Sequence, residues 1–222
     1  MVIYSRDNPS SRYCELIGYY QEMHAKGVIS QNIPVEKTFD GLSILKHVVH
    51  IQRIINILGS QTILDYGAGK GKQYEPSDIE TGDGRIFPDI QTFWNVVSIT
   101  CFDPAYKPFN DVPQCVFDGV VTTDVLEHCP RDDIPWIVDE IFRYATDFVY
   151  ISVACYPATK TLPNGENAHC TLEPPEWWDS IFKKCVRKTP GLRYYTAYDV
   201  SKKQLDGTNE ITTIMGHGRW DK

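Results

Sequence analysis

Residues 62–74 read TILDYGAGKGKQY, an apolar run that ends in an acid and continues into three glycines at every second position. The run 62–66 has the length and composition of a short buried strand. Gly67, Gly69 and Gly71 then permit unusual backbone dihedrals and let a ligand approach the main chain closely. Free backbone N–H groups in such a loop suit an anionic group. In a doubly wound sheet, ligands bind outside the carboxyl ends of the strands, so this stretch predicts a ligand site.

Helical patterns occur on both sides of this strand. Apolar residues recur at helical spacing, and each pattern carries residues that favour helix ends. A proline fits the first turn because its missing N–H would have no partner there. The predicted helices are 11–27, ending at Gly27; 42–58, capped by Asp40 and closed by Gly59; and the stretch from Asp132 or Asp133 to about residue 144, with Pro135 in its first turn.

Further apolar runs, at 96–102, 117–123 and 148–154, have the length of buried strands. The acidic stretch 75–92, rich in Gly and Pro, predicts an inserted loop. Strands that alternate with helices are typical of a parallel sheet covered on both faces. We therefore expect an α/β fold with a Rossmann-like, doubly wound, mostly parallel sheet in three layers. N-terminal helices and an aromatic-rich C-terminal elaboration complete it.

The composition narrows the class of protein. Of the 222 residues, 42% are hydrophobic and 23% are charged, and the net charge is −7. This length suits a single domain, and the negative charge disfavours a broad nucleic-acid surface. No two of the seven cysteines have C-x-x-C spacing, so we expect reduced thiols in a cytoplasmic protein. We expect neither a leader nor a membrane span, and no metal site, because the acids at 75–89 lack the spacing of a calcium loop.

Two common nucleotide-binding motifs fit the glycine loop poorly. A dinucleotide site requires G-x-G-x-x-G and an acid roughly 20 residues further on. Here Lys72 occupies the position of the third glycine, and the next strand-end acid, Asp103, lies 32 residues beyond Gly71. The P-loop spacing G-x-x-x-x-G-K-[ST] is absent as well. These differences disfavour a dehydrogenase and a P-loop enzyme.

Residues 65–71, DYGAGKG, resemble motif I of the class I S-adenosylmethionine-dependent methyltransferases, which is an acid followed by x-G-x-G-x-G. Three further segments resemble the same family in the correct order. They are ITCFDPAY (99–106), like the end of its second strand; FDGVVTTDVLEHCP (117–130), like its fourth-strand segment with D-x-L-E-H; and FVYISVACYP (148–157), like its fifth strand.

The resemblance covers roughly residues 40–157 and implies a single methyltransferase domain. Within it, 1–39 would form an N-terminal helical cap, 40–157 the cofactor-binding core, and 158–222 an elaboration on the substrate side. The implied cofactor is S-adenosyl-L-methionine, and the product formed from it is S-adenosyl-L-homocysteine.

The resemblance also implies which residues bind the cofactor. Asp65 would lie near its amino group, and Gly67 and Gly69 would give its methionine part access to the backbone. Asp103 would accept hydrogen bonds from both ribose hydroxyls, and the backbone at 124–126 would border the adenine or methionine part. No third-strand motif is clear between Asp103 and residue 117, so the adenine contacts are unassigned. The implied set is Asp65, Tyr66, Gly67, Ala68, Gly69, Asp103, Pro104, Asp124, Val125 and Leu126.

Two histidines are the catalytic candidates. Methyl transfer from a sulfonium is an in-line displacement for which the cofactor supplies the electrophile and the protein aligns the nucleophile. An oxygen nucleophile usually needs a base, and histidine suits that role near neutral pH. His128 follows the fourth strand, and His169 lies in the polar loop 162–178, which should overhang the pocket. Packing is the plainer interpretation for His128, and a solvated turn is the plainer one for His169.

The substrate-binding candidates follow the fifth strand. They are Tyr156, Asn167, Glu173, Trp177 and Trp178. The two tryptophans equally fit a helix that begins after two prolines and packs on the sheet. The N-terminal helix, with aromatic residues at 13, 19 and 20, fits either a lid or a packed element. The segment TFDGLS (38–43) is placed to approach the cofactor.

We therefore predict a methyltransferase for a small-molecule substrate, with oxygen favoured over nitrogen and a hydroxylated or sugar-like acceptor slightly favoured. One alternative is a nucleic-acid amino-methyltransferase, because DPAY (103–106) comes near its [DNS]-P-P-[YFW] motif. The second proline is missing, however, and TDVLEH stands where that motif normally lies. The other alternative is a non-catalytic, cofactor-binding partner subunit. The sequence does not assign an oligomeric state.

Overall fold

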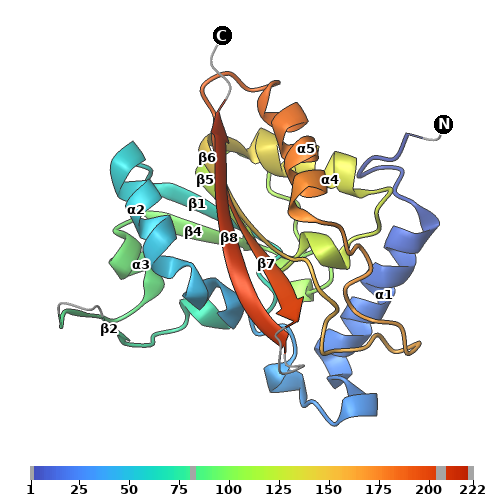
Figure 1. Cartoon of the computed structure of the whole chain (residues 1–222). Coiled ribbons are helices and arrows are strands. Elements are labelled where there is room, and N and C mark those ends of the chain that lie inside the picture. Colours follow the sequence, from blue (N-terminus) through green and yellow to red (C-terminus); the bar gives the residue numbers. More distant parts are fainter. Residues whose placement is uncertain (1–2, 81–83, 204–208, 220–222) are drawn as a thin grey trace.

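The computed structural model describes residues 3–80, 84–203 and 209–219. Its main sheet has six strands: β1 (Thr62–Tyr66), β4 (Ser98–Phe102), β5 (Phe117–Thr123), β6 (Ala145–Ala154), β7 (Arg193–Lys203) and β8 (Asn209–Arg219). The strand order is β4-β1-β5-β6-β7-β8 (Figure 1). Neighbouring strands pair in parallel from β4 to β7, and β8 is antiparallel to β7. This mixed α/β fold with a mostly parallel sheet is consistent with the predicted Rossmann-like arrangement.

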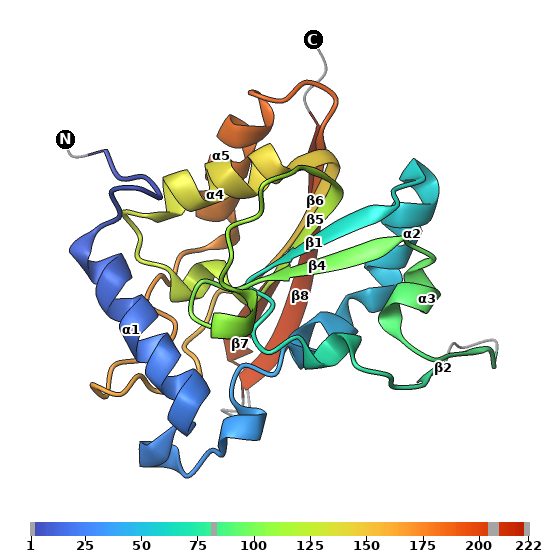
Figure 2. The ribbon, with the colours of Figure 1, turned by 180° about the vertical axis from the view of Figure 1, so that it is seen from behind.

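Helices pack on both faces of the sheet (Figure 2). On one face, α2 (Val48–Leu58) and α3 (Ile90–Trp94) share a buried cluster with Ile63 of β1. On the other face, α4 (Ile134–Tyr144) and α5 (Pro175–Val186) share a second cluster with Leu64. Successive side chains of a strand point to opposite faces, so these two neighbours each anchor one side.

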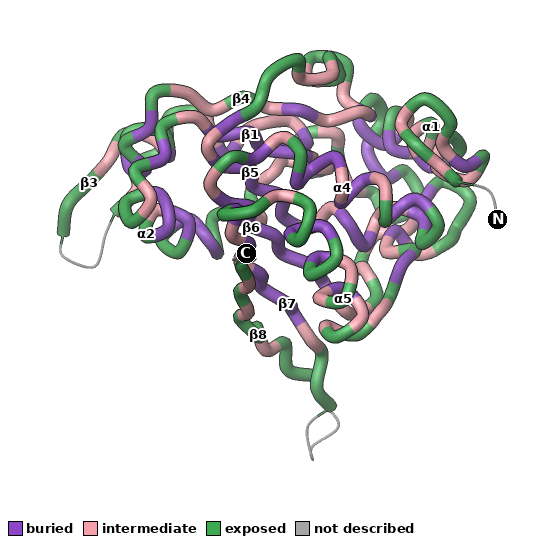
Figure 3. The backbone as a smooth tube through the Cα atoms, turned by 90° about the horizontal axis from the view of Figure 1, so that it is seen from above, coloured by how far each residue is buried: buried purple, intermediate pink, exposed green. Residues whose placement is uncertain are grey.

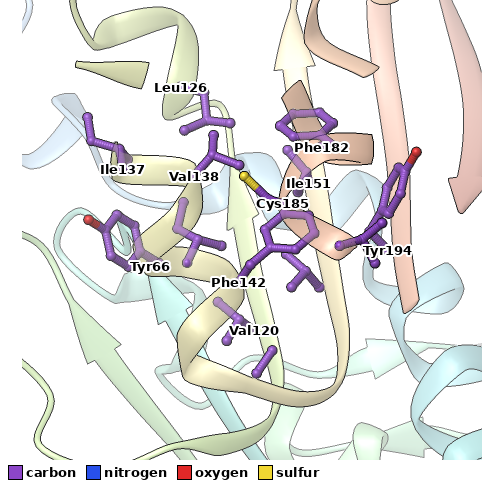
Figure 4. Packing of buried hydrophobic residues seen from close by; sticks show 14 of the residues in the cluster. Tyr66, Val120, Leu126, Ile137, Val138, Phe142, Ile151, Phe182, Cys185 and Tyr194 are labelled. Carbon is purple, nitrogen blue, oxygen red and sulfur yellow. The ribbon is translucent and has the colours of Figure 1, made fainter. Parts of the chain in front are cut away.

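The cluster under α4 and α5 is rich in large aromatic side chains. Phe142 of α4, Phe182 of α5 and Tyr194 of β7 lie together in it (Figure 4). The Phe142 and Phe182 rings are nearly parallel, with centroids 6.3 Å apart. Full burial of one such side chain stabilises the fold by about 1.5–3 kcal/mol. The apolar face of α5 therefore fixes this helix on the sheet.

The C-terminal tail differs from the elaboration that the sequence predicts. After α5 it enters the sheet as β7, parallel to β6, and returns as the edge strand β8. Most of β8 is exposed, whereas β6 and the first part of β7 are buried (Figure 3). Because β8 gains its structure by pairing with β7, its own sequence has little of the apolar pattern that marks a buried strand.

The helix expected at 42–58 is shorter than predicted. Residues Leu42–Lys46 form a 3-10 helix, and α2 begins only at Val48. Between them lies His47, whose Nδ1 is 3.0 Å from the hydroxyl of Tyr150 on β6. The prediction of Asp40 as the N-cap is wrong, because Gly41 precedes the 3-10 helix and His47 precedes α2. The Asp40 Oδ1 instead accepts the Leu42 N–H at 3.2 Å, in the turn before the 3-10 helix. The 3-10 helix and α2 are therefore separated at His47, where a tertiary contact is made. Helical periodicity in the sequence does not reveal this interruption.

The stretch 75–92, predicted as a loop, holds short elements. β2 (Ile79–Glu80) pairs with β3 (Ile86–Phe87), and α3 follows directly. Asp89 caps α3 by accepting the Thr92 N–H at 2.6 Å. Two-residue strands and a five-residue helix are too short to show a periodic pattern, which is why the sequence does not predict them.

Two predicted helices are confirmed. α1 (Ser11–Lys26) begins after Ser10, whose Oγ accepts the Tyr13 N–H, and ends at Gly27 with φ of 75°. α4 begins after Asp133, with proline in its first turn. The Asp133 Oδ1 also accepts the Ser10 N–H at 3.0 Å, so the starts of the two helices are joined. Among the described helices, none has the length and apolar character needed to cross a membrane.

Candidate functional site

A cavity of about 530 Å³ lies at the carboxyl ends of β1, β4, β5 and β6. Ligand pockets for small molecules typically measure about 300–1,000 Å³, so the space suits a cofactor-sized ligand. Side chains of α1 close it on one side, and the segment 154–169 contributes to another. A buried cluster that includes Leu16 of α1, Ala105 and Leu162 joins these segments.

The glycine loop after β1 forms part of the cavity wall. Gly67 has φ of 86°, and a Cβ atom there would lie 2.3 Å from Val125 Cγ2. Gly69 has φ of 58°, and a Cβ atom there would lie 2.4 Å from Phe39 O. Both positions require glycine, because the backbone is left-handed and the neighbours leave no space for a side chain. The main chain itself is therefore the surface that a ligand would meet.

The backbone N–H groups of this loop are not free. Because all five of them donate to protein oxygens, the expectation of an anion-binding loop is wrong, and a phosphate has no donors here. The bonds run from Gly67 and Ala68 to Phe102 O (2.7 and 3.1 Å), from Gly69 to Asp103 Oδ2 (2.9 Å), from Lys70 to Phe39 O (2.8 Å) and from Gly71 to Ala68 O (3.1 Å).

Asp103 lies where β4 ends and lines the cavity. Its Oδ2 accepts the Gly69 N–H, and its Oδ1 accepts the Ala105 N–H, each at 2.9 Å. Burial raises the pKa of this carboxyl to about 6, although the backbone hydrogen bonds oppose the rise. A carboxylate offers about four lone-pair sites, so each oxygen retains the capacity to accept a further hydroxyl.

Three residues of the implied cofactor set lie behind the wall. Asp65 is buried, its Oδ2 accepts hydrogen bonds from Gln73 Nε2 and Tyr74 OH at 2.9 and 2.8 Å, and burial raises its pKa to about 6. Ala68 and Leu126 are also buried and are absent from the described cavity lining. Asp65 therefore holds the turn that follows the loop. The other members of the implied cofactor set line the cavity. They are Tyr66, Gly67, Gly69, Asp103, Pro104, Asp124 and Val125.

Two strained residues face the same cavity. Asp124 and Phe39 have φ of 55° and 51°, a left-handed backbone conformation that is uncommon for residues other than glycine. The Asp124 N–H is held by Ser152, lying 3.1 Å from its Oγ. Such strain concentrates at functional sites, where the surrounding structure maintains it.

The two candidate histidines meet at the cavity. Their ring centroids are 4.7 Å apart, and the rings are nearly perpendicular. The Nδ1 of His128 lies 2.9 Å from Ala168 O, and the Nδ1 of His169 lies 2.6 Å from Tyr156 O. A carbonyl oxygen only accepts, so each Nδ1 carries a proton and each Nε2 keeps its lone pair.

Both histidines are neutral at pH 7. Burial lowers the pKa of His128 to about 3, and the neighbouring His169 adds to the effect. Burial also lowers the pKa of His169, although its hydrogen bond to the Tyr156 carbonyl opposes this. A group with a pKa near 3 accepts a hydrogen bond more readily than a proton, so His169 is the better candidate base.

Four of the five substrate-binding candidates lie outside the lining of this cavity. Asn167 holds its own loop, because its amide bonds the N–H and the carbonyl of Ala158 at 2.9 and 2.8 Å. Trp178 is fully buried in the core, and its Nε1 donates to the Glu173 carbonyl at 3.1 Å. The interpretation of the tryptophans as a helix packed on the sheet therefore describes Trp178.

The neighbouring candidates point toward a common arginine. The Glu173 carboxylate pairs with Arg131 at 2.8 Å, and the Arg131 guanidinium lies 5.2 Å from the Trp177 ring. Trp177 is only partly buried against the core. Among the five candidates, only Tyr156 lines the described cavity.

Sequence reasoning missed several lining residues. Lys160 is one, and nothing in its local sequence marks it. Of the α1 aromatic residues in the lid interpretation, Tyr13 and Tyr20 do line the cavity, whereas Tyr19 is absent from the described lining. The side chains at 16, 17 and 24 were missed, although they complete one helical stripe with these two tyrosines. The segment 38–43 does approach the cavity, which Phe39, Asp40, Gly41 and Ser43 line.

The charged residues give the cavity a negative balance. Its described lining contains the carboxylates Asp40, Asp103 and Asp124 and a single ammonium group, Lys160. Burial also lowers the pKa of the third lining histidine, His24, to about 4. The three lining histidines therefore add no positive charge at pH 7, and the cavity favours a cationic ligand over an anionic one.

The chain is an α/β protein with a cofactor-sized cavity at the carboxyl ends of its parallel strands. No family model matches the chain, and a search of curated proteins finds no match.

Proposed function

We propose that the protein is a class I S-adenosylmethionine-dependent methyltransferase for a small-molecule acceptor, with oxygen as the favoured nucleophile. The observation that carries the proposal is the contact between the glycine loop and Asp103. The Asp103 carboxylate is fixed by the Gly69 N–H at the wall of a cofactor-sized cavity. We also assign the fold to the doubly wound, three-layer Rossmann-like class, which helices on both faces of the sheet support.

Charge supports this cofactor over a dinucleotide. A sulfonium is cationic and a pyrophosphate is anionic, whereas three carboxylates line this cavity. The loop amides that would hold a pyrophosphate all donate to protein oxygens. Both features favour S-adenosylmethionine and disfavour NAD.

The chain provides a fitting position for each part of the cofactor. Gly67 and Gly69 line the cavity with main-chain atoms alone, so the ligand can lie against the backbone. Asp103 would accept hydrogen bonds from the ribose hydroxyls. Asp124, held at the end of β5, offers a carboxylate for an ammonium group. Asp65 supports the loop from behind and does not contact the ligand.

The histidines provide the proton chemistry. When bound, the cofactor supplies a sulfonium methyl group as the electrophile, and the electrons of the broken S–C bond remain on sulfur as a thioether. The acceptor oxygen forms the new bond to carbon, and its proton passes to Nε2 of His169. His128 orients the acceptor, because its Nε2 is a weak base but a competent hydrogen-bond acceptor.

An enclosed acceptor suits this arrangement better than a nucleic acid does. α1 lies across the cavity with five of its side chains in the wall, so a small molecule can be surrounded. A non-catalytic cofactor-binding subunit would show the same cofactor affinity, and detection of methylated product separates it from an enzyme.

The test is calorimetric titration of Asp103→Asn with S-adenosylhomocysteine. This variant should bind the ligand at least about tenfold more weakly than the wild type, because a charged acceptor is lost. Asp111→Asn is the matched control, since Asp111 is exposed and does not line the cavity. Equal affinity of the wild type and Asp103→Asn would remove Asp103 from the site.

A further inference from the structure

Lys160 is the one ammonium or guanidinium group among the described residues that line the cavity. It lies in the segment after β6, and its Nζ is 5.6 Å from the centroid of the Phe39 ring. Within the described part of the chain, its Nζ pairs with none of the three lining carboxylates. A lysine that faces a ligand cavity without a carboxylate partner is available to bind an anion.

Lys160 acts on the two histidines of the site. Its carbonyl accepts the Ala168 N–H at 3.1 Å, and the Ala168 carbonyl lies 2.9 Å from Nδ1 of His128, so Lys160 lies in the same part of the cavity wall as both rings. Its positive charge accordingly contributes to the lowered pKa of His128 and of His169. Both rings present an Nε2 lone pair, because each Nδ1 donates to a backbone carbonyl. This end of the cavity therefore combines one cation with two neutral hydrogen-bond acceptors.

The remainder of the cavity has the opposite character. Asp103 and Asp124 lie at the ends of β4 and β5, and Asp40 lies beside the glycine loop segment. An anion would be repelled by these carboxylates and attracted only at Lys160. A ligand with both an anionic and a hydroxyl group thus has one favourable orientation, with its anion at Lys160 and its hydroxyl at the histidines.

We propose that the acceptor is a small hydroxylated anion, a hydroxycarboxylate or a hydroxylated phosphate ester, whose charged group binds Lys160 and whose hydroxyl donates to Nε2 of His169. The inference rests on the proposed function and narrows its substrate class. The anionic group contributes to binding and is not methylated. The hydroxyl oxygen receives the methyl group and releases its proton to His169, so the product keeps its negative charge.

The experiment measures binding to protein saturated with S-adenosylhomocysteine, with four defined probes. The carboxylate pair is 3-hydroxybenzoate and 3-hydroxybenzamide, and the phosphate pair is glycerol 3-phosphate and glycerol. At least one anion should bind about tenfold or more tightly than its neutral partner, because a charged hydrogen bond is gained. The pair that shows the preference identifies the source of the anion.

Two variants then test Lys160 itself. Lys160→Met should reduce the preference for the anion to about threefold or less while the affinity for S-adenosylhomocysteine stays unchanged. Lys37→Met changes the net charge equally at an exposed residue outside the lining, and should keep the preference. An unchanged preference in Lys160→Met, or no preference for either anion in the wild type, would overturn the inference.

The binding data separate the proposed function from the proposed acceptor. Absence of S-adenosylhomocysteine binding would overturn the proposed function together with this inference. Binding of S-adenosylhomocysteine without any preference for an anion would overturn only the inference about the acceptor.

Discussion

Gly69 joins three parts of the site through its backbone. Its N–H donates to Asp103, and its Cα faces the Phe39 carbonyl so closely that a Cβ atom would lie 2.4 Å from that oxygen. The φ of 58° adds a conformational requirement. One residue thus sets both the position of the proposed ribose acceptor and the shape of the wall.

Gly69→Ala should therefore be strongly destabilising. Gly191→Ala is the matched control, because Gly191 has φ of 89° but no atom within 4 Å of the position that an added Cβ would take. The control should lose about 1–2 kcal/mol, the cost of a left-handed alanine. Gly69→Ala should lose clearly more of the free energy of unfolding, measured by urea denaturation. Equal losses of the free energy of unfolding in the two variants would show that the close contact with Phe39 does not make Gly69→Ala more destabilising.

The sequence predicts the positions of such residues better than their contacts. The spacing of Gly67, Gly69 and Asp103 locates the site, because strand ends and glycine loops are local signals. It does not reveal that the loop amides are all bonded, since Phe102, Asp103 and Phe39 reach them from other segments. Trp178 fails as a prediction for a related reason: periodicity indicates a helix but not which cluster it packs against.

At the scale of elements, α5 belongs to the core and not to the ligand site. Trp178 is fully buried beside Phe182, with ring centroids 6.4 Å apart and the rings nearly parallel. Neither α5 residue lines the described cavity. The helix therefore contributes to stability, and Trp178 is expected to have no direct contact with a ligand.

Trp178→Phe should lower the free energy of unfolding by about 1–3 kcal/mol, because a cavity forms and the indole N–H bond to Glu173 is lost. The affinity for S-adenosylhomocysteine should stay within about twofold of the wild type, since small changes of this kind are usually local. Denaturation and calorimetry measure the two quantities. A stable variant that binds the ligand much more weakly would place Trp178 in the site after all.

Elements with a strong local pattern are the ones that the sequence predicts. β1 and β5 are found at 62–66 and 117–123 as expected, because both are short apolar runs beside turn residues. The sequence does not predict β8, because this strand is largely exposed and its conformation depends on pairing with β7. α1 is predicted with its cap and end, whereas its place over the cavity depends on contacts such as Tyr20 OH with Ala168 O at 3.1 Å.

At the scale of the whole molecule, the cavity is assembled from distant segments. α1, the glycine loop, the ends of β4 and β5, and the segment after β6 all contribute to it. Its negative balance is a property of this assembly, because Asp40, Asp103 and Asp124 are far apart in the sequence. The net charge of −7 alone does not predict it.

The central claim is that this cavity binds S-adenosylmethionine and its product. The most direct measurement is calorimetric titration of the wild-type protein with S-adenosylhomocysteine and, separately, with NAD. The account predicts micromolar binding of S-adenosylhomocysteine with one site per chain, and no binding of NAD. Binding of NAD without binding of S-adenosylhomocysteine would contradict the assignment of the cofactor, and with it the proposed methyl transfer.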